Sequence, residues 1–285
     1  DGTGAPQSKI AIERLVNHAL SDDNKRGRSR FAHDVMLALG RPADAVRYLE
    51  ASADSANDPN VAIILVRDAT LGMIDPRLAT DAAKRLRAIE LRPEPADSAG
   101  REVQRAVIRV MEPWRISQGD TTQSRRSIQR LRAITRDVPE SDAIAAELEY
   151  SFIEMLLAGA GRSPDHRRIV ERLDSLVLLQ DVGVGSSSRR VLQTISAAHA
   201  WGQLGDAARA QSMIARYGVW TSENLPYLGL QLREQGRIAA SAGDKKRAIR
   251  AYRHFLRMNA VAEGVTVPQM DSVRKELAML ESPGH

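Results

Sequence analysis

Residues 236–258, GRIAASAGDKKRAIRAYRHFLRM, decide the fold of this chain. Apolar residues recur every three or four positions on both sides of Gly243, which is typical of two amphipathic helices. Gly243 suits the left-handed residue that ends a helix, and Asp244 can cap the helix that follows. Because the link is so short, the two helices are predicted to form an antiparallel hairpin, in which the small Ala248 allows close approach.

The same arrangement, a turn glycine followed five residues later by alanine, occurs twice more. Gly40 and Ala45 stand in LGRPADA, and Gly205 and Ala210 stand in LGDAARA. Asp206 offers the same helix cap as Asp244 does in the last hairpin. Three hairpins of one design are therefore expected at separate places along the chain.

Helical periodicity runs through most of the remaining sequence, and strand-like alternation is almost absent. We predict an all-α protein of about fourteen helices joined by short links, which pair as antiparallel hairpins. A series of hairpins that each bury one face on the next forms an α-solenoid. The expected organisation is a flexible start at 1–8, an irregular hairpin array at 9–182, a hairpin pair at 186–258 and a C-terminal capping helix at 267–282.

Two local expectations concern the middle of the chain. Residues 98–117 have the pattern of one long helix, but Pro113 lies inside it and is expected to kink or end it. The sequence Asp120-Thr121-Thr122 is expected to cap the next helix.

Composition limits the kinds of partner. The 285 residues include 43% hydrophobic and only 4% aromatic residues, so the core must consist mainly of Leu, Ala, Val and Ile. The formal charge is +5, from 41 basic and 36 acidic residues. Because the acids are interspersed among the bases, the pattern favours a solvated surface over a nucleic-acid arm.

No constellation in the sequence indicates catalysis, a metal or a cofactor. Cysteine is absent, and no two histidines stand three to five residues apart, so a helical metal pair is not predicted. The Gly-rich stretch at 183–188 could cradle a phosphate, but no Lys-Ser/Thr follows it, and we interpret it as a loop between repeats.

The sequence leaves the compartment open. It contains no apolar run long enough to span a membrane and no signal-peptide pattern. It begins with Asp1 and lacks cysteine, which fits a cytoplasmic chain, a processed exported chain or a piece of a larger protein or assembly.

The last hairpin resembles the tetratricopeptide repeat. The small Gly236 lies seven residues before the turn glycine, and the aromatic Tyr252 lies four residues after Ala248, as in that family. The hairpin that turns at Gly205 keeps a small residue, Ala198, seven positions before the turn, but has Ile214 in the aromatic position. The first hairpin departs from the pattern, because His33 stands where the small residue is expected. The resemblance covers about 186–258 and extends more weakly to 27–56. It implies a right-handed solenoid in which the first helix of each hairpin lines a concave groove.

The resemblance also implies a function, that of a scaffold or adaptor. Transferred to this sequence, the groove positions are Arg233 and Arg237 in the last hairpin, and His199 and Gln203 in the hairpin before it. Two guanidiniums on one helix face suit a carboxylate or an acidic peptide, so the expected function is protein–protein interaction. The C-terminal stretch is also similar to the repeat regions of some bacterial serine/threonine kinases and large transcriptional activators. A sensory or regulatory segment of such a protein therefore remains the alternative.

Overall fold

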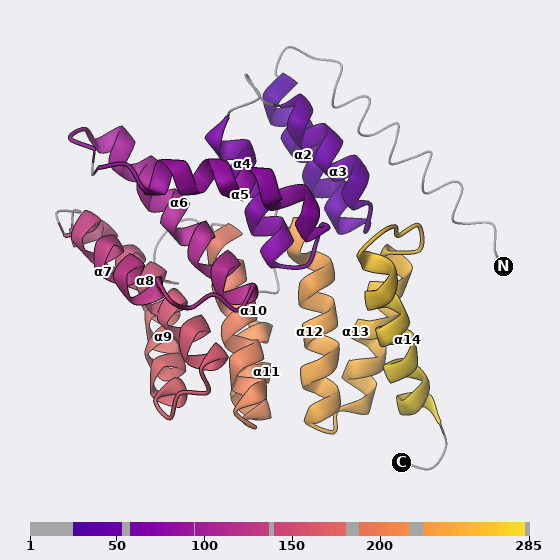
Figure 1. The fold of residues 1–285 in the computed structure, drawn as a ribbon. Coiled ribbons are helices and arrows are strands. Elements are labelled where there is room, and N and C mark those ends of the chain that lie inside the picture. Colours follow the sequence, from indigo (N-terminus) through magenta and orange to yellow (C-terminus); the bar gives the residue numbers. More distant parts are fainter. Residues whose placement is uncertain are drawn as a thin grey trace. The chain divides into compact units, whose positions relative to one another are not determined.

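The chain is helical throughout the part that the structure describes. The computed structural model describes residues 25–52, 58–93, 95–136, 140–180, 188–216 and 225–282. These residues form thirteen α-helices and one short 3-10 helix, with no strand among them (Figure 1). The all-α prediction is confirmed. The helix expected at 10–20 and the loop at 183–187 lie outside the described residues.

The chain divides into two compact units. Unit 1 comprises residues up to Val61, the short segment Gly72–Asp75, and everything from Tyr217 onward. Unit 2 comprises Ala62–Leu71 and Pro76–Arg216. Unit 1 is thus built from both ends of the sequence, whereas the sequence analysis divides the chain into consecutive segments.

Unit 1 contains two hairpins and a final helix. Helix α2 packs on α3, α12 packs on α13, and α13 packs on α14, while the 3-10 helix η1 contacts α2. Figure 1 shows α12, α13 and α14 as three adjacent helices. The bounds are α2 Lys25–Ala38, α3 Pro42–Ala51, η1 Leu225–Tyr227, α12 Leu228–Ser241, α13 Lys245–Met258 and α14 Thr266–Glu281.

Unit 2 contains the remaining helices, and α5 to α11 each contact a neighbour. Helix α8 pairs with α9, α10 pairs with α11 and packs on α9, and α6 contacts α5, α7 and α8. Helix α4 begins in unit 1 and lies mostly in unit 2. The bounds are α4 Pro59–Thr70, α5 Pro76–Glu90, α6 Ser98–Ser117, α7 Ser124–Ile134, α8 Glu140–Ala160, α9 His166–Gln180, α10 Ser188–Gln203 and α11 Ala207–Ala215.

The three turns with glycine close in the same way. Gly40, Gly205 and Gly243 have φ of 69°, 78° and 76°, in the left-handed region. In each turn the next residue donates its backbone N–H to the carbonyl five residues earlier, at 2.9 Å. The predicted caps are confirmed, because Asp206 and Asp244 accept the backbone N–H three residues later at 3.1 and 3.0 Å.

The two expectations for the middle of the chain are only partly met. Helix α6 has the predicted bounds, but it does not end at Pro113 and continues to Ser117. The prediction that Asp120 caps the next helix is wrong. Its carboxylate accepts the backbone N–H of Thr122 at 3.1 Å in a turn before the helix, and α7 begins at Ser124 with no side-chain cap.

The two ends of the sequence meet at Gly40. Its carbonyl accepts the backbone N–H of Glu263 at 2.8 Å, from the link between α13 and α14. A Cβ at Gly40 would lie 2.5 Å from Asn259 Oδ1 and 2.9 Å from Thr266 Cγ2. Gly40 is therefore required twice, for its backbone conformation and for the close approach of the other segment.

Gly40→Ala is expected to destabilise unit 1 by about 2–4 kcal/mol, since left-handed strain adds to steric overlap. Gly243→Ala is the matched control, because it has the same conformation and no heavy atom within 4 Å of the added Cβ. Gly243→Ala should lower the free energy of unfolding by about 1 kcal/mol, the cost of placing alanine in the left-handed conformation. Urea unfolding of both variants measures the difference. Equal losses would show that the contact between the two ends does not stabilise unit 1.

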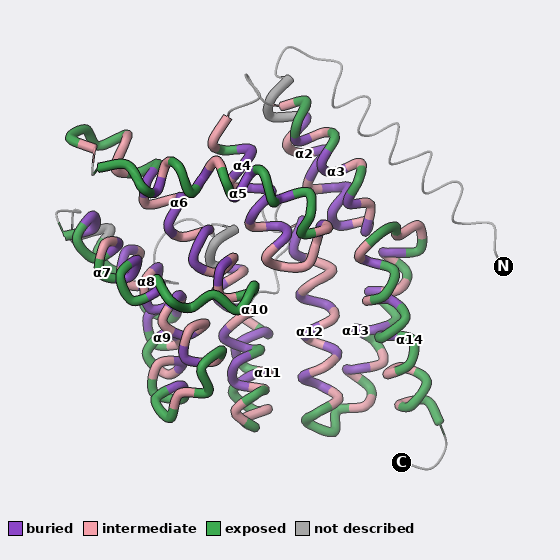
Figure 2. Tube along the Cα trace, viewed as in Figure 1, coloured by how far each residue is buried: buried purple, intermediate pink, exposed green. Residues whose placement is uncertain are grey.

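Small apolar cores hold each unit together. In unit 1, buried residues of α12, α13 and α14 form one cluster: Leu232, Tyr252, Phe255, Met270 and Val273. In unit 2, buried residues of α6, α7 and α8 form another: Ile108, Ile128, Leu131, Ile134 and Ile153. Figure 2 shows buried stretches alternating with exposed ones along these helices, as expected when one helix face packs against neighbours.

Candidate functional site

The last hairpin is held by an unusually close contact between helices. Gly236 in α12 lies against the ring of Tyr252 in α13, and a Cβ at this position would overlap the ring, coming within 2.9 Å of Cζ. Tyr252 and Ala248 are both fully buried. The backbone of α12 can approach the aromatic ring only because residue 236 has no side chain. Ala45 and Ala210 are fully buried in their own hairpins as well.

Arg237 lies beside Gly236 on α12 and is held by an acidic residue of the same helix. Its Nε donates to both carboxylate oxygens of Glu234, at 3.0 and 3.2 Å, and its Nη2 donates to Glu234 as well. Glu234 is buried, whereas the Arg237 side chain is 37% exposed. These hydrogen bonds raise the pKa of Arg237 and hold its guanidinium beside Glu234.

Behind this pair, Tyr252 links α13 to α14. Its hydroxyl donates to Glu276, whose other carboxylate oxygen accepts from Ser272 at 3.2 Å. Burial, together with the hydrogen bond to Glu276, raises the pKa of Tyr252 well above its usual range. The phenol therefore remains a proton donor at physiological pH, and the contact is structural.

Arg233, one turn before Arg237, lacks such a partner. It is partly buried, and burial lowers the pKa of its guanidinium, although the charges of Glu234 and Glu276 partly offset this. Within the described residues it makes no hydrogen bond or ion pair of its own. The nitrogens of Arg233 are not among the buried polar atoms that lack a hydrogen-bond partner, so solvent reaches its guanidinium.

The other two predicted groove residues belong to unit 2. His199 and Gln203 are exposed on α10, and their side-chain nitrogens Nε2 lie 2.9 Å apart in a hydrogen bond. Arg233 and Arg237 belong to unit 1. The four residues thus form two separate pairs, one in each unit, and each pair occupies successive turns of one helix.

Unit 2 carries a surface depression of about 710 Å³ between α7, α8 and the start of α9. Its lining includes the apolar residues Ile128, Leu157 and Ile169 and the basic residues Arg125 and Arg132. Arg132 is paired with Glu154 at 2.5 Å, so its charge is largely compensated. The size is in the range of ligand pockets, but sequence reasoning gave no signal for it, because its lining comes from three separate helices.

A buried group of charges in unit 2 was also not anticipated. Arg115 of α6 bonds Glu112 one turn earlier and reaches Glu90 of α5 with two N–H donors, one at 2.9 Å. All three residues are less than 9% exposed. Burial opposes the charge of Arg115, but the hydrogen bonds and charges of the two glutamates outweigh it and raise its pKa. In the sequence these residues resemble ordinary surface charges of amphipathic helices.

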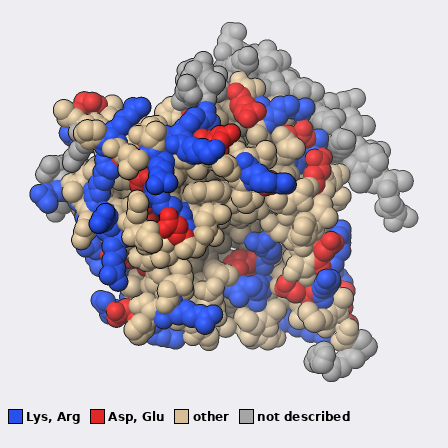
Figure 3. Space-filling model, in the orientation of Figure 1, with Lys and Arg blue, Asp and Glu red and all other residues tan. Residues whose placement is uncertain are grey.

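On the face shown in Figure 3, Lys and Arg side chains are spread over the molecule with Asp and Glu among them. Among the described residues no cluster of three or more His, Asp or Glu is arranged to hold a metal ion. None of the described helices combines the length and apolar character that crossing a bilayer requires.

Comparison with known proteins adds no relative to this description. No family model matches the chain, and neither a curated protein nor a solved structure matches it.

Proposed function

We propose that this chain is an interaction module that binds a segment of another protein on the exposed face of α12. Arg233 receives a carboxylate or carbonyl of that segment, and Arg237 stands beside it. Because Glu234 already holds Arg237, the second guanidinium is preorganised and loses little side-chain entropy on binding. The function is thus recognition, with Arg233 as the residue that pairs directly.

The observation that carries this proposal is the partly buried guanidinium of Arg233, which makes no hydrogen bond or ion pair within the described residues. Structural arginines elsewhere in the chain find acidic or carbonyl partners, as Arg115 and Arg130 do. Arg233 is placed on a rigid helix, one turn from Arg237, and has its donors unused. Donors of this kind are typical of sites that a partner completes.

We also propose that the helical hairpins belong to a right-handed solenoid of the tetratricopeptide type. Two findings support this. The three glycine turns share one hydrogen-bond pattern, and the close contact of Gly236 with Tyr252 reproduces the small-to-aromatic packing of that repeat. In such a solenoid the face of α12 that bears Arg233 would form part of a groove.

The test uses a displayed library of random peptides with free C-terminal carboxylates, selected on the purified chain. We expect enrichment of peptides that carry acidic residues or depend on their terminal carboxylate. The enriched peptides should lose binding to the double variant Arg233→Glu/Arg237→Glu, because the reversed charges repel them. Increasing salt should weaken binding to the wild type.

The control is the double variant Arg274→Glu/Lys275→Glu, which changes the net charge equally at two exposed positions of α14. Its peptide binding should stay within about twofold of the wild type, since exposed charges that do not contact the peptide are largely screened by salt. The proposal is wrong if no peptide is enriched, or if the enriched peptides bind the α12 variant as well as the wild type.

A further inference from the structure

Helix α13 carries an array of positive charge that is only partly compensated by acidic groups. Its fourteen residues, KKRAIRAYRHFLRM, include six Lys or Arg and no acidic residue. On a helical projection of 100° per residue, the exposed positions 246, 250, 253, 254 and 257 fall within an arc of about 100°. The buried Ala248, Ala251, Tyr252 and Phe255 occupy the opposite side. We call the exposed set Lys246, Arg250, Arg253, His254 and Arg257 the basic stripe.

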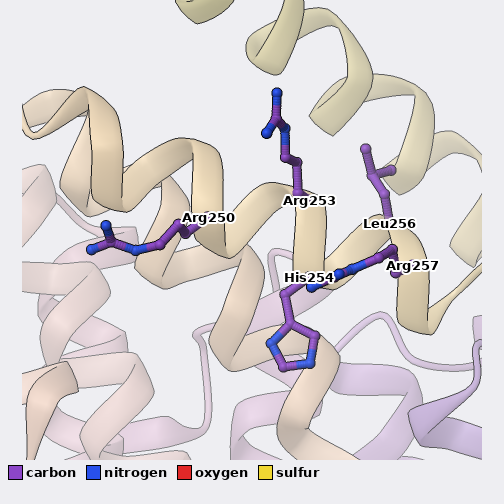
Figure 4. A pocket seen from close by; sticks show the side chains of 5 residues that line it. All are labelled: Arg250, Arg253, His254, Leu256 and Arg257. Atoms are coloured by element: carbon purple, nitrogen blue, oxygen red, sulfur yellow. The ribbon is translucent and has the colours of Figure 1, made fainter.

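The basic stripe surrounds a shallow depression of about 630 Å³, which is lined by Arg250, Arg253, His254, Leu256 and Arg257. Figure 4 shows that these five side chains all project from this one helix. Among the described residues, the side chains that line the depression all come from α13. The aliphatic Leu256 is half-buried at the edge of the stripe and gives the depression a small apolar component.

The stripe is poorly compensated by the protein itself. Arg253 pairs with Glu281 of α14 at 2.8 Å. Within the described residues, Lys246, Arg250 and Arg257 make no ion pair or side-chain hydrogen bond. Like charges three and four residues apart destabilise a helix, and cations in its first turn oppose the helix dipole. The array therefore costs stability in the isolated chain, and an acidic partner would offset that cost.

We propose that the basic stripe is a docking surface for an acidic amphipathic helix of a partner protein. Positions 246 to 257 extend about 16 Å along the helix axis, at 1.5 Å per residue. A partner helix with carboxylates at positions i, i+4, i+7 and i+11 presents the same spacing, so each acid can meet a guanidinium or ammonium group. An apolar side chain between those acids would contact Leu256.

One observation favours a protein helix over an anionic bilayer. Binding to an anionic bilayer usually adds insertion of apolar side chains, but none of the exposed large apolar residues of the described chain lies on α13. The stripe is formed by different residues from those proposed to bind on α12, so the two proposals can fail separately.

The experiment measures fluorescence anisotropy of a labelled helical peptide of about 18 residues. The probe carries glutamates at i, i+4, i+7 and i+11 with one leucine between them, and a second peptide of the same composition has the glutamates distributed around the helix. The wild-type chain should bind the first peptide at least about tenfold more tightly than the second, and the affinity should fall as salt rises.

Variants of the chain identify the residues responsible. Arg250→Glu/Arg257→Glu should weaken binding of the acidic peptide at least about tenfold. The same variant should bind a matching lysine peptide, because charge pairing that is direct works with the signs exchanged. Arg274→Glu/Lys275→Glu, with the same change in net charge on α14, should leave binding within about twofold. Circular dichroism checks that both double variants remain helical. The Arg233→Glu/Arg237→Glu variant should still bind the acidic helix, which separates this result from the test of α12.

Several results would overturn the proposal. Absence of binding to the acidic helix would do so, as would equal losses for the α13 and α14 variants, because the effect would then be one of net charge. A third result would assign the stripe to a phosphate-bearing partner instead. In that case the wild type would bind the peptide weakly but would bind a short DNA duplex or vesicles containing phosphatidylserine, and the α13 variant would lose this binding.

Discussion

Gly236→Ala is expected to lower the free energy of unfolding of unit 1 by about 3 kcal/mol. The added methyl group would overlap the ring of Tyr252, which is fully buried and cannot rotate away freely. Any shift of the ring also weakens the hydrogen bond from its hydroxyl to Glu276, worth about 1 kcal/mol. The better helix propensity of alanine, about 1 kcal/mol, offsets part of the loss. Urea unfolding, followed by hydrogen exchange of α12, measures the effect.

The same helix provides the control. Gly229 lies in the first turn of α12, and a Cβ there would meet its nearest neighbours, in Met258 and Phe255, at an ordinary 3.7 Å. Gly229→Ala should therefore be neutral or stabilising by up to about 1 kcal/mol. Combining Gly236→Ala with Tyr252→Leu should cost less than the sum of the two single changes, because the smaller side chain leaves room for the methyl group. Strict additivity would mean that the two residues do not constrain each other.

Arg115→Met is expected to destabilise unit 2 by about 3–5 kcal/mol. The substitution keeps much of the side-chain volume but leaves the carboxylates of Glu90 and Glu112 buried together without a cation. One oxygen of Glu112 already lacks a hydrogen-bond partner in the described structure, so few other groups could stabilise its negative charge. Thermal unfolding followed by circular dichroism would record the loss.

Two further variants separate charge from packing. Arg274→Met removes an exposed arginine paired with Asp271 at 2.7 Å and should change stability little. The triple variant Glu90→Gln/Glu112→Gln/Arg115→Met removes all three charges and should recover much of the loss, since buried ion pairs contribute little net stability. If the triple variant is as unstable as Arg115→Met alone, packing and not the uncompensated charge is the cause.

The sequence was informative where the structure depends on neighbours along the chain. The turns at Gly40, Gly205 and Gly243 and the caps at Asp206 and Asp244 involve residues within one turn of each other, so their chemistry is visible in a few letters. The cap expected at Asp120 was wrong for a related reason. An aspartate can bond its own local backbone in a turn as well as at a helix start, and the letters do not distinguish the two.

Features that depend on distant residues were not predictable. Nothing near Glu90 in the sequence indicates that Arg115 of another helix will bury it. Nothing near Gly40 indicates that Glu263 will bond to its carbonyl. The candidate groove residues were placed by counting from turn glycines, which gives the position along a helix. It does not reveal that Glu234 engages Arg237 while Arg233 keeps its donors unused.

The construction of unit 1 from both ends of the sequence has a consequence during synthesis of the protein. The hydrogen bond from Gln269 to the carbonyl of Gly72 joins residues 197 positions apart. At ribosomal rates of about 5–20 residues per second, the N-terminal hairpin α2–α3 emerges roughly 10–40 s before the segment that contains Gln269. The contacts that Gly40 and Gly72 make with this later segment cannot form during that interval. The hairpin therefore has to persist on the packing of α2 against α3 until the end of the chain is made.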